Sequence, residues 1–360
     1  KGNNIIMLNV LKKIYDRYFH DEEAVILLFL IFSFLSVMLF MGGILAPVIA
    51  ALVLAFLLQG VVLKFQNLGL SHLLSVSISC ILLILGLVIG LGILMPLVLD
   101  QLSNLGRDIP SFIQALQNHL QRLPESYPSF ISTTQVEEWI EVLSSGLGGF
   151  GQSALSFSVS KIPNLVSFII YLILVPVLVF FFLKDKELLH QWFGEKLPKK
   201  RPLMSRIWLE MNQQMANYVR GKAIEILIVG VVSYIVFVSF GLNYAALLAM
   251  AVGLSVIVPY VGALIVTIPV FIVAMLQWGW GGDLMWLMIA YFVIQALDGN
   301  ALVPFLFSEA VNLHPVAILL AILIFGGIWG LWGVFFAIPL ATFVKSILNA
   351  WPSRPADQSF

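Results

Sequence analysis

The chain has 360 residues, of which 60% are hydrophobic and only 11% are charged, and its formal net charge is zero. A soluble domain is about half apolar and roughly a quarter charged, so this composition excludes an ordinary water-soluble fold and favours a protein embedded in the lipid bilayer. The balanced charge gives no reason to expect a nucleic-acid partner, and the single cysteine, Cys80, excludes an internal disulfide.

The apolar segments predict an all-α, polytopic helical membrane protein with about eight membrane segments, because a spanning helix needs about 20 apolar residues. Six segments are uninterrupted: 24–41, 44–62, 73–99, 162–183, 223–240 and 284–307. Two more are interrupted, 245–276 and 315–348, and these are predicted to be broken helices or re-entrant hairpins.

The same pattern predicts the domain organisation in chain order. The expected parts are a cytoplasmic amphipathic N-terminal segment (1–23), the first three membrane helices (24–99), an extracytoplasmic helical cap (100–161), the fourth membrane helix (162–183), a basic cytoplasmic segment (184–222), a C-terminal membrane bundle with the two broken segments (223–349) and a cytoplasmic tail (350–360).

The orientation follows from the basic residues, which concentrate in cytoplasmic loops. Of the 19 Lys and Arg residues, only Arg107, Arg122 and Lys161 lie in the 100–161 segment. Both termini are therefore predicted to be cytoplasmic and the 100–161 segment extracytoplasmic. Within that segment, Thr134 followed by Glu137 predicts a capping-box helix start. A packed cap is the expected role, with a ligand lid as the alternative.

Sequence motifs for enzymes and nucleotide sites fail in context. The glycines of 146–151 match G-x-G-x-x-G, but no apolar strand precedes them, so a hinge into the fourth membrane helix is the better interpretation. The five histidines lack metal-ligand spacing, and no nucleophile motif occurs. The sequence predicts no enzyme, no cofactor and no metal site. The one ion expected to bind is sodium or a proton.

The first interrupted segment, 245–276, breaks at Pro259, Tyr260 and Gly262. Each arm has 14 residues, about 21 Å of helix, which is short for a hydrocarbon core of about 30 Å. A long kinked helix or two tight full spans are the plain alternatives. The functional alternative is a re-entrant hairpin with its tip at mid-membrane, where protein or a water-filled cavity must surround the exposed backbone.

The second interrupted segment, 315–348, repeats this design around a glycine-rich joint. The predicted hinge glycines are Gly326, Gly327, Gly330 and Gly333. The alternative places Trp329 and Trp332 in an outer aromatic belt. Two hairpins that enter from opposite sides are typical of transporters with a midplane site, and here they would act as gates.

The stretch 295–307 places Gln295, Asp298, Asn300 and Pro304 in an apolar run. One interpretation is a helix that ends at Leu297 in a surface turn. The favoured one is a broken helix inside the membrane, whose free carbonyls, with Asp298, bind a sodium ion or a proton, because a buried carboxylate is by default a functional-site candidate. Glu225 is a further pathway candidate, or it pairs with Lys222 three residues before it.

These residues carry a family resemblance over nearly the whole chain. The stretches "YVRGKAIEILIVG", "VPYVGALIVTIP", "QALDGNALVPFLF" and "NLHPVAILLAILIFGGIWGLWGVFFAIPLA" resemble the autoinducer-2 exporter family of bacterial permeases, especially its PerM-like branch. Ala263 stands where members often have a second proline. The resemblance implies secondary export of small polar signals, sodium or protons as candidate coupling ions, the bacterial inner membrane, and a homo-oligomer with a pentamer among the candidate assemblies.

The sequence thus predicts a secondary transporter of a small polar solute that works by alternating access around Asp298, Gln295 and Asn300. The alternative is a non-transporting membrane scaffold that binds partners through the 100–161 cap and the basic 184–222 segment.

Overall fold

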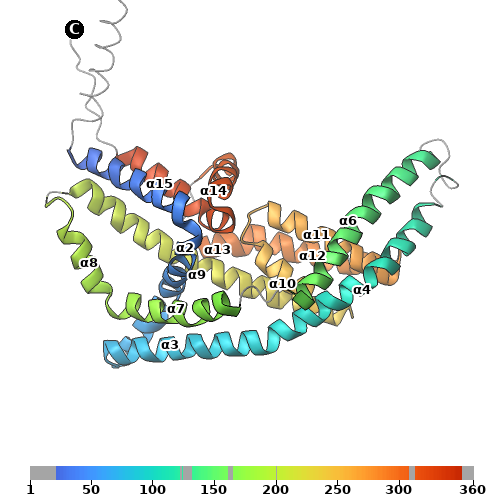
Figure 1. Cartoon of the computed structure of the whole chain (residues 1–360), viewed down its shortest axis with the longest axis horizontal. Helices are drawn as coiled ribbons and strands as arrows, with labels where there is room; N and C mark the ends of the chain where they lie inside the picture. The colour runs from blue at the N-terminus through green and yellow to red at the C-terminus, as the bar shows by residue number, and fades with distance from the viewer. Residues whose placement is uncertain are drawn as a thin grey trace, which may run out of the picture. The chain divides into compact units, whose positions relative to one another are not determined.

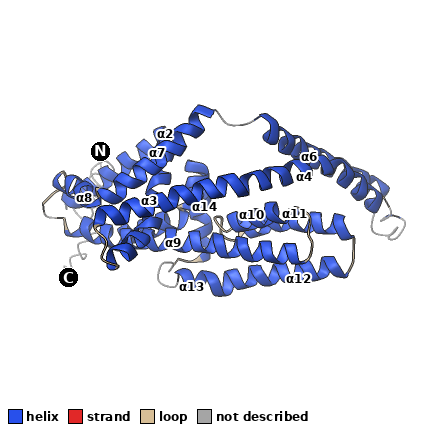
Figure 2. Ribbon diagram, turned by 90° about the horizontal axis from the view of Figure 1, so that it is seen from below, coloured by secondary structure: helices blue, strands red, loops and turns tan. Residues whose placement is uncertain are grey.

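The computed structural model describes residues 22–121, 124, 132–160, 165–199, 201–307 and 313–350, and these are helical nearly throughout, with no strand among them (Figures 1 and 2). Six of the described helical stretches are long and apolar enough to cross a membrane, and shorter apolar helices accompany them. The prediction of an all-α, polytopic membrane protein is therefore confirmed. Residues 1–21 and 351–360 of the predicted terminal segments lie outside the described residues.

The helices fall into two compact units, each with its own contacts. One unit comprises Lys1–Cys80, Leu174–Gly221 and Phe307–Phe360, and the other comprises Ile81–Ile173 and Lys222–Leu306. The elements are α2 (Glu22–Asn67), α3 (His72–Ile89), η1 (Gly90–Leu94), α4 (Met95–Leu120), α6 (Thr133–Ser160), α7 (Leu165–Lys184), α8 (Lys186–Glu195), α9 (Pro202–Ser239), α10 (Ala245–Ser255), α11 (Val261–Trp278), α12 (Gly282–Leu297), η2 (Asp298–Leu302), α13 (Val303–Phe307), α14 (Pro315–Phe335) and α15 (Ala337–Ala350).

Helix α2 corrects the prediction of two separate spans at 24–41 and 44–62. The backbone stays helical for 46 residues, through Gly42 and Gly43. Two glycines cost helix propensity, about 1 kcal/mol each, but no polar turn residue accompanies them to end the helix. The helix contains Pro47 and bends along its course (Figure 1), since a proline inside a helix is a usual cause of a kink.

The first turn of α2 and the first residue of α3 contact the basic segment of the same unit. At the start of the helix, Glu23 Oε1 accepts a hydrogen bond of 2.6 Å from the backbone N–H of Met204. Just after its end, the ring Nε2 of His72 lies 3.3 Å from the carbonyl oxygen of Lys184. The last turns of α15 join the first contact, because Phe343 and Ile347 pack against the cluster of Leu27, Met204 and Ile207.

The predicted cap is a pair of long helices, α4 and α6, which pack side by side (Figure 1). Helix α6 begins with a reciprocal cap, in which the N–H of Ser132 donates to Gln135 Oε1 and the N–H of Gln135 donates to Ser132 Oγ, at 3.1 and 3.3 Å. The predicted capping box at Thr134 and Glu137 was therefore misplaced by two residues. The predicted hinge at 146–151 is also wrong, because these glycines lie inside α6.

The first interrupted segment forms a helical hairpin of α10 and α11, seen beside α12 in Figure 2. Gln277 ties its base together, since its Oε1 accepts from the N–H of Asn243 and its Nε2 donates to the carbonyl of Gly241, both at 2.8 Å. At the tip, a Cβ on Gly262 would lie 1.8 Å from the carbonyl oxygen of Ser255, so only glycine fits. Helix α10 has 11 residues, about 16 Å, too short to cross the bilayer. The segment is therefore a hairpin of two helices rather than one kinked helix.

The second interrupted segment is also a hairpin, made by α14 and α15 within the other unit. Its backbone leaves the helical region at Gly330, which has φ +59° and ψ −132°. Beyond this turn, a Cβ on Gly333 would lie 1.8 Å from the carbonyl oxygen of Phe325, as at the first tip. Trp329 stacks on Phe325 and its indole nitrogen is buried, so its packing inside the hairpin opposes the aromatic-belt alternative.

The helix that carries Asp298 does not end at Leu297 and does not break. It continues through the π-helical turn η2 into α13, and the N–H of Val303 still donates to the carbonyl of Asp298. Pro304 follows, which lacks an N–H and collides with the turn before it, so a wider turn accommodates it. The same arrangement occurs at η1, which precedes Pro96. Both the predicted surface turn and the predicted broken helix are therefore wrong.

Candidate functional site

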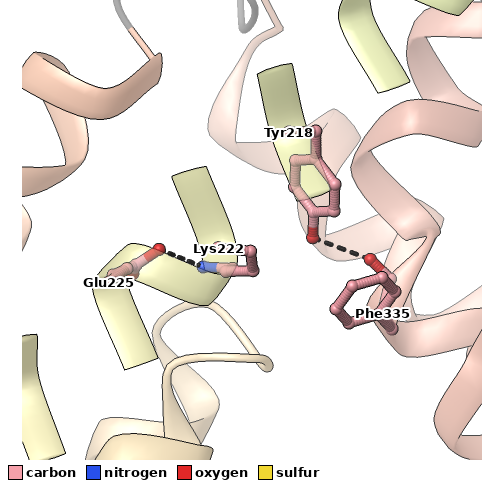
Figure 3. A network of polar contacts seen from close by, with 4 residues as sticks. All are labelled: Tyr218, Lys222, Glu225 and Phe335. Atoms are coloured by element: carbon pink, nitrogen blue, oxygen red, sulfur yellow. Dashed lines mark hydrogen bonds and ion pairs between the residues drawn. The ribbon is translucent and has the colours of Figure 1, made fainter. Parts of the chain in front are cut away.

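A buried ion pair lies on α9. Lys222 Nζ is 2.8 Å from Glu225 Oε2, and the two residues are 4% and 2% exposed (Figure 3). Their spacing of three residues places both side chains on one face of the helix. The alternative pairing of Glu225 with Lys222 is thereby confirmed, but the pair is buried rather than solvated, which makes each charge depend on the other.

Asp298 belongs to the same cluster. It interacts electrostatically with Lys222, and its charge also acts on Glu225. Its Oδ1 atom is buried and has no hydrogen-bond partner within the part of the chain that the structure describes. Buried polar atoms are nearly always satisfied, so this oxygen marks a place for a proton, a cation or water.

The tip of the α10–α11 hairpin lies beside this cluster. On the α9 side, a Cβ on Gly253 would lie 2.9 Å from the carbonyl oxygen of Ile226, the residue after Glu225. Gly253 is two residues from the end of α10, so the turn that follows comes next to the ion pair. The tip itself is held in an unusual conformation, because Tyr260 has φ +63°, a region that costs a non-glycine residue about 1–2 kcal/mol.

The α12 side of the cluster is fixed to the same tip. The Tyr291 hydroxyl lies 2.9 Å from Thr267 Oγ1 and 3.4 Å from the carbonyl oxygen of Ala263, near the start of α11. Gln295 lies one turn beyond Tyr291, beside its hydroxyl, and Asp298 follows about one turn later. The tip, α9 and α12 thus converge on one group of polar side chains, which we call the charge cluster: Lys222, Glu225, Gln295 and Asp298.

Other predicted site residues do not join the charge cluster in this structure. Asn300 is exposed, and its Nδ2 donates to the carbonyl of Ala296 on its own helix. Pro304 is exposed on α13. Pro259 and Tyr260 form the hairpin turn, and the Tyr260 side chain is 62% exposed.

The glycines of the second joint belong to the other unit, which has its own polar contact. Tyr218 donates from its hydroxyl to the carbonyl oxygen of Phe335 at 2.7 Å (Figure 3). The Tyr218 ring also packs against the rings of Phe307 and Phe335. Phe335 is five residues beyond the turn at Gly330, so α9 is anchored to the second hairpin through this tyrosine.

A polar cavity of about 420 Å³ lies at the base of the first hairpin. Its lining residues are Gln101, Asn104, Arg107, Asp108, Asn243 and Tyr244. The Tyr244 hydroxyl donates to Asp108, and Gln101 Oε1 accepts from the N–H of Leu247 at 2.8 Å. The hairpin therefore has a polar cavity at its base and the charge cluster at its tip.

Sequence reasoning missed several of these residues. Lys222 was seen only as a partner of Glu225, although a lysine in an apolar helix is itself a signal of an internal site. Tyr291 could have been found as a polar ring in the apolar run before Asp298. Gly253 and the cavity residues Arg107 and Asp108 gave no comparable signal, because their roles depend on which helices pack together.

Several apolar helices, two helical hairpins and a buried charge cluster define a polytopic membrane protein with polar groups placed inside its membrane segments. Comparison with known proteins shows to which family of membrane proteins the chain belongs. A sequence model described as AI-2E family transporter matches residues 26–353. The chain therefore belongs to the AI-2E family of transporters, as the resemblance indicated.

Two relatives illustrate the match. The chain is 42% identical over 346 residues to "Putative permease PerM" of Escherichia coli strain K12, covering 96% of this chain and 98% of the relative. It is 26% identical over 306 residues to "Putative transport protein YrrI" of Bacillus subtilis strain 168, covering 84% and 85%. Both descriptions name a transport protein.

Proposed function

We propose that this protein is a secondary exporter of a small polar solute, driven by sodium ions or protons that bind at Asp298. The observation that carries the proposal is the composition of the charge cluster: Glu225 is paired with Lys222 at 2.8 Å, and a second carboxylate, Asp298, interacts electrostatically with the same lysine. With all three groups ionised, the charge cluster has a net charge of −1, and two of its three charged groups are buried. A proton or a sodium ion compensates it, and Asp298 has the unpartnered oxygen to receive either.

Binding of this ion would control the movement of the hairpin. Its tip packs against both α9 and α12 beside the charge cluster, so a change in the charge of the cluster acts directly on the tip. We propose that α10 and α11 enter the membrane partway as a re-entrant hairpin and move as a gate. The polar cavity at the base, lined by amide, guanidinium and carboxylate groups, would hold the solute.

A thiol at the tip tests the re-entrant hairpin. Val261, the first residue of α11, is 38% exposed. We expect Val261→Cys, in a Cys80→Ser background, to react with small hydrophilic thiol reagents, and its rate to change when sodium or pH is changed, because a water-lined tip is required at that depth. If the cysteine at position 261 stays unreactive under all conditions while a control cysteine at an exposed surface position reacts, the gate is contradicted.

We further propose that the protein resides in the bacterial inner membrane with both termini in the cytoplasm, as a homo-oligomer. The contacts of Glu23, Phe343 and Ile347 support placing both termini on one side, because they bring the start of α2 and the end of α15 to the same basic segment.

Labelling at the start of α6 tests the orientation. Ser132 is exposed there. We expect Ser132→Cys in the Cys80→Ser background to be modified by an impermeant thiol reagent added outside intact cells. Modification only after the inner face has been opened would reverse the topology.

Flux in proteoliposomes tests transport itself. Sodium and protons serve as probes: we expect an imposed sodium or pH gradient to drive ion movement in liposomes that contain the protein, and not in empty ones. Internal pH is read with a trapped dye and sodium with a radioactive tracer. A membrane scaffold that binds partners through α4, α6 or the 184–222 segment would give no flux with either ion.

A further inference from the structure

We propose that α8 and the first turns of α9 bind the headgroups of anionic phospholipids at the membrane surface. This inference is independent of transport. It rests on three features of one unit: exposed aromatic and aliphatic side chains on both helices, a surplus of basic residues around them, and the position of α8 directly after an apolar helix.

Large apolar side chains are exposed on both helices. The residues, each more than half exposed, are Leu188, Trp192, Phe193, Trp208 and Leu209. On α8, Leu188 and Trp192 share one face because they are four residues apart, and the Phe193 ring lies 4.8 Å from the Trp192 ring. Side chains of this size are seldom left in water together, and tryptophan favours the boundary between lipid tails and headgroups.

The two helices contact each other at two points. The His190 and Trp208 rings are 5.8 Å apart, and the Arg201 guanidinium donates to the carbonyl oxygen of Gly194 at the end of α8. The other side of α9 is already occupied, since Met204 and Ile207 are buried against α2 and α15. Trp208 and Leu209 remain exposed next to this packed side.

The basic side chains around this surface indicate that its ligand is anionic. Residues 184–210 contain seven basic and four acidic side chains. Lys186, Lys196, Lys199 and Arg206 are all exposed, so their charges are free to meet an external anion. A surface that is both apolar and cationic matches an anionic bilayer, in which the rings enter the interface and the bases reach the phosphates.

The position of α8 in the chain places this surface next to the membrane. Helix α7 is a 20-residue apolar helix that ends at Lys184, and α8 begins two residues later. A helix that starts where an apolar helix ends is positioned at the headgroup level. Lys184 itself lies 5.7 Å from the centre of the Phe181 ring, which places a cation beside an aromatic side chain at this boundary.

Fluorescence quenching by brominated lipids tests the inference. In a Cys80→Ser background, Trp192→Cys and the control Gln191→Cys are labelled with a polarity-sensitive dye and reconstituted with brominated phosphatidylcholine or phosphatidylglycerol. We expect the label at 192 to be quenched at least twofold more than the label at 191. Phosphatidylglycerol should quench it more at equal mole fraction, because each basic residue favours an anionic surface roughly fivefold.

A charge variant separates lipid-headgroup binding from plain insertion. Lys196→Gln/Lys199→Gln/Arg206→Gln should bring the phosphatidylglycerol to phosphatidylcholine quenching ratio close to one, while quenching by phosphatidylcholine stays unchanged. Equal, weak quenching at 191 and 192 would show that this face lies in water or against protein, and overturns the inference. A ratio that the charge variant does not change also overturns it.

Discussion

Asp298→Asn is expected to insert and fold normally and to lose ion-driven flux, down to the level of empty liposomes. The substitution keeps the shape of the side chain and removes the charge that Lys222 and Glu225 experience. It also removes the carboxyl group, so this position can no longer take up a proton. With one carboxylate left, Lys222 and Glu225 balance each other, and no ion is needed to neutralise the charge cluster.

The measurement compares sodium- and proton-driven flux for the wild type, Asp298→Asn and the matched control Asn300→Ala. Asn300 sits on the same π-helical turn but is exposed and bonded to its own helix, so its variant should keep most of the flux. Asp298→Glu should retain partial flux with a shifted pH profile. An Asp298→Asn protein that transports with the wild-type pH profile would remove this residue from the mechanism.

Gly262→Ala is expected to disrupt the first hairpin and to lower the stability of the protein by more than about 3 kcal/mol, beyond the usual cost of overpacking. The added methyl would lie 1.8 Å from the carbonyl oxygen of Ser255, and its three nearest atoms are all backbone atoms of that residue. These atoms cannot move without opening the turn between α10 and α11. The contacts that hold the tip beside Ile226 and Tyr291 should be lost with it.

Thermal unfolding of the purified protein in detergent measures this effect, with Gly327→Ala as the control. Gly327 is also a glycine of a hairpin segment, but nothing lies within 4 Å of its added Cβ. Its variant should unfold within a few degrees of the wild type. If Gly262→Ala and Gly327→Ala unfold at the same temperature, the close packing at the first tip is wrong.

The sequence was a good guide to where the hairpins turn. Pro259 and Gly262 marked the first joint and the glycines around Gly330 marked the second, because a reversal needs residues with special backbone freedom. It was a poor guide where a helix merely changes its course. Gly42 and Gly43 look like a break but lie in one bent helix, and Pro304 widens its helix into a π turn. Interior prolines such as Pro176 produce no such turn, so the residue type alone does not decide.

The candidate site shows the same limit. Asp298, Gln295 and Glu225 stood out because polar groups are costly in an apolar run. Their grouping did not, since Glu225 and Asp298 are 73 residues apart in the sequence and only the packing of Gly253 and Tyr291 brings their helices to one hairpin tip. Asn300 lies two residues from Asp298 in sequence and yet bonds within its own helix.

Infrared difference spectroscopy of the reconstituted protein tests most directly whether Asp298 carries the ion. Spectra are recorded on switching between sodium-rich and sodium-free buffer, and between low and high pH. We predict a carboxyl band that appears or shifts with the ion, is absent in Asp298→Asn and persists in Glu225→Gln. A band that is unchanged in Asp298→Asn, or no ion-dependent carboxyl signal at all, would contradict the assignment of Asp298 as the ion-binding group.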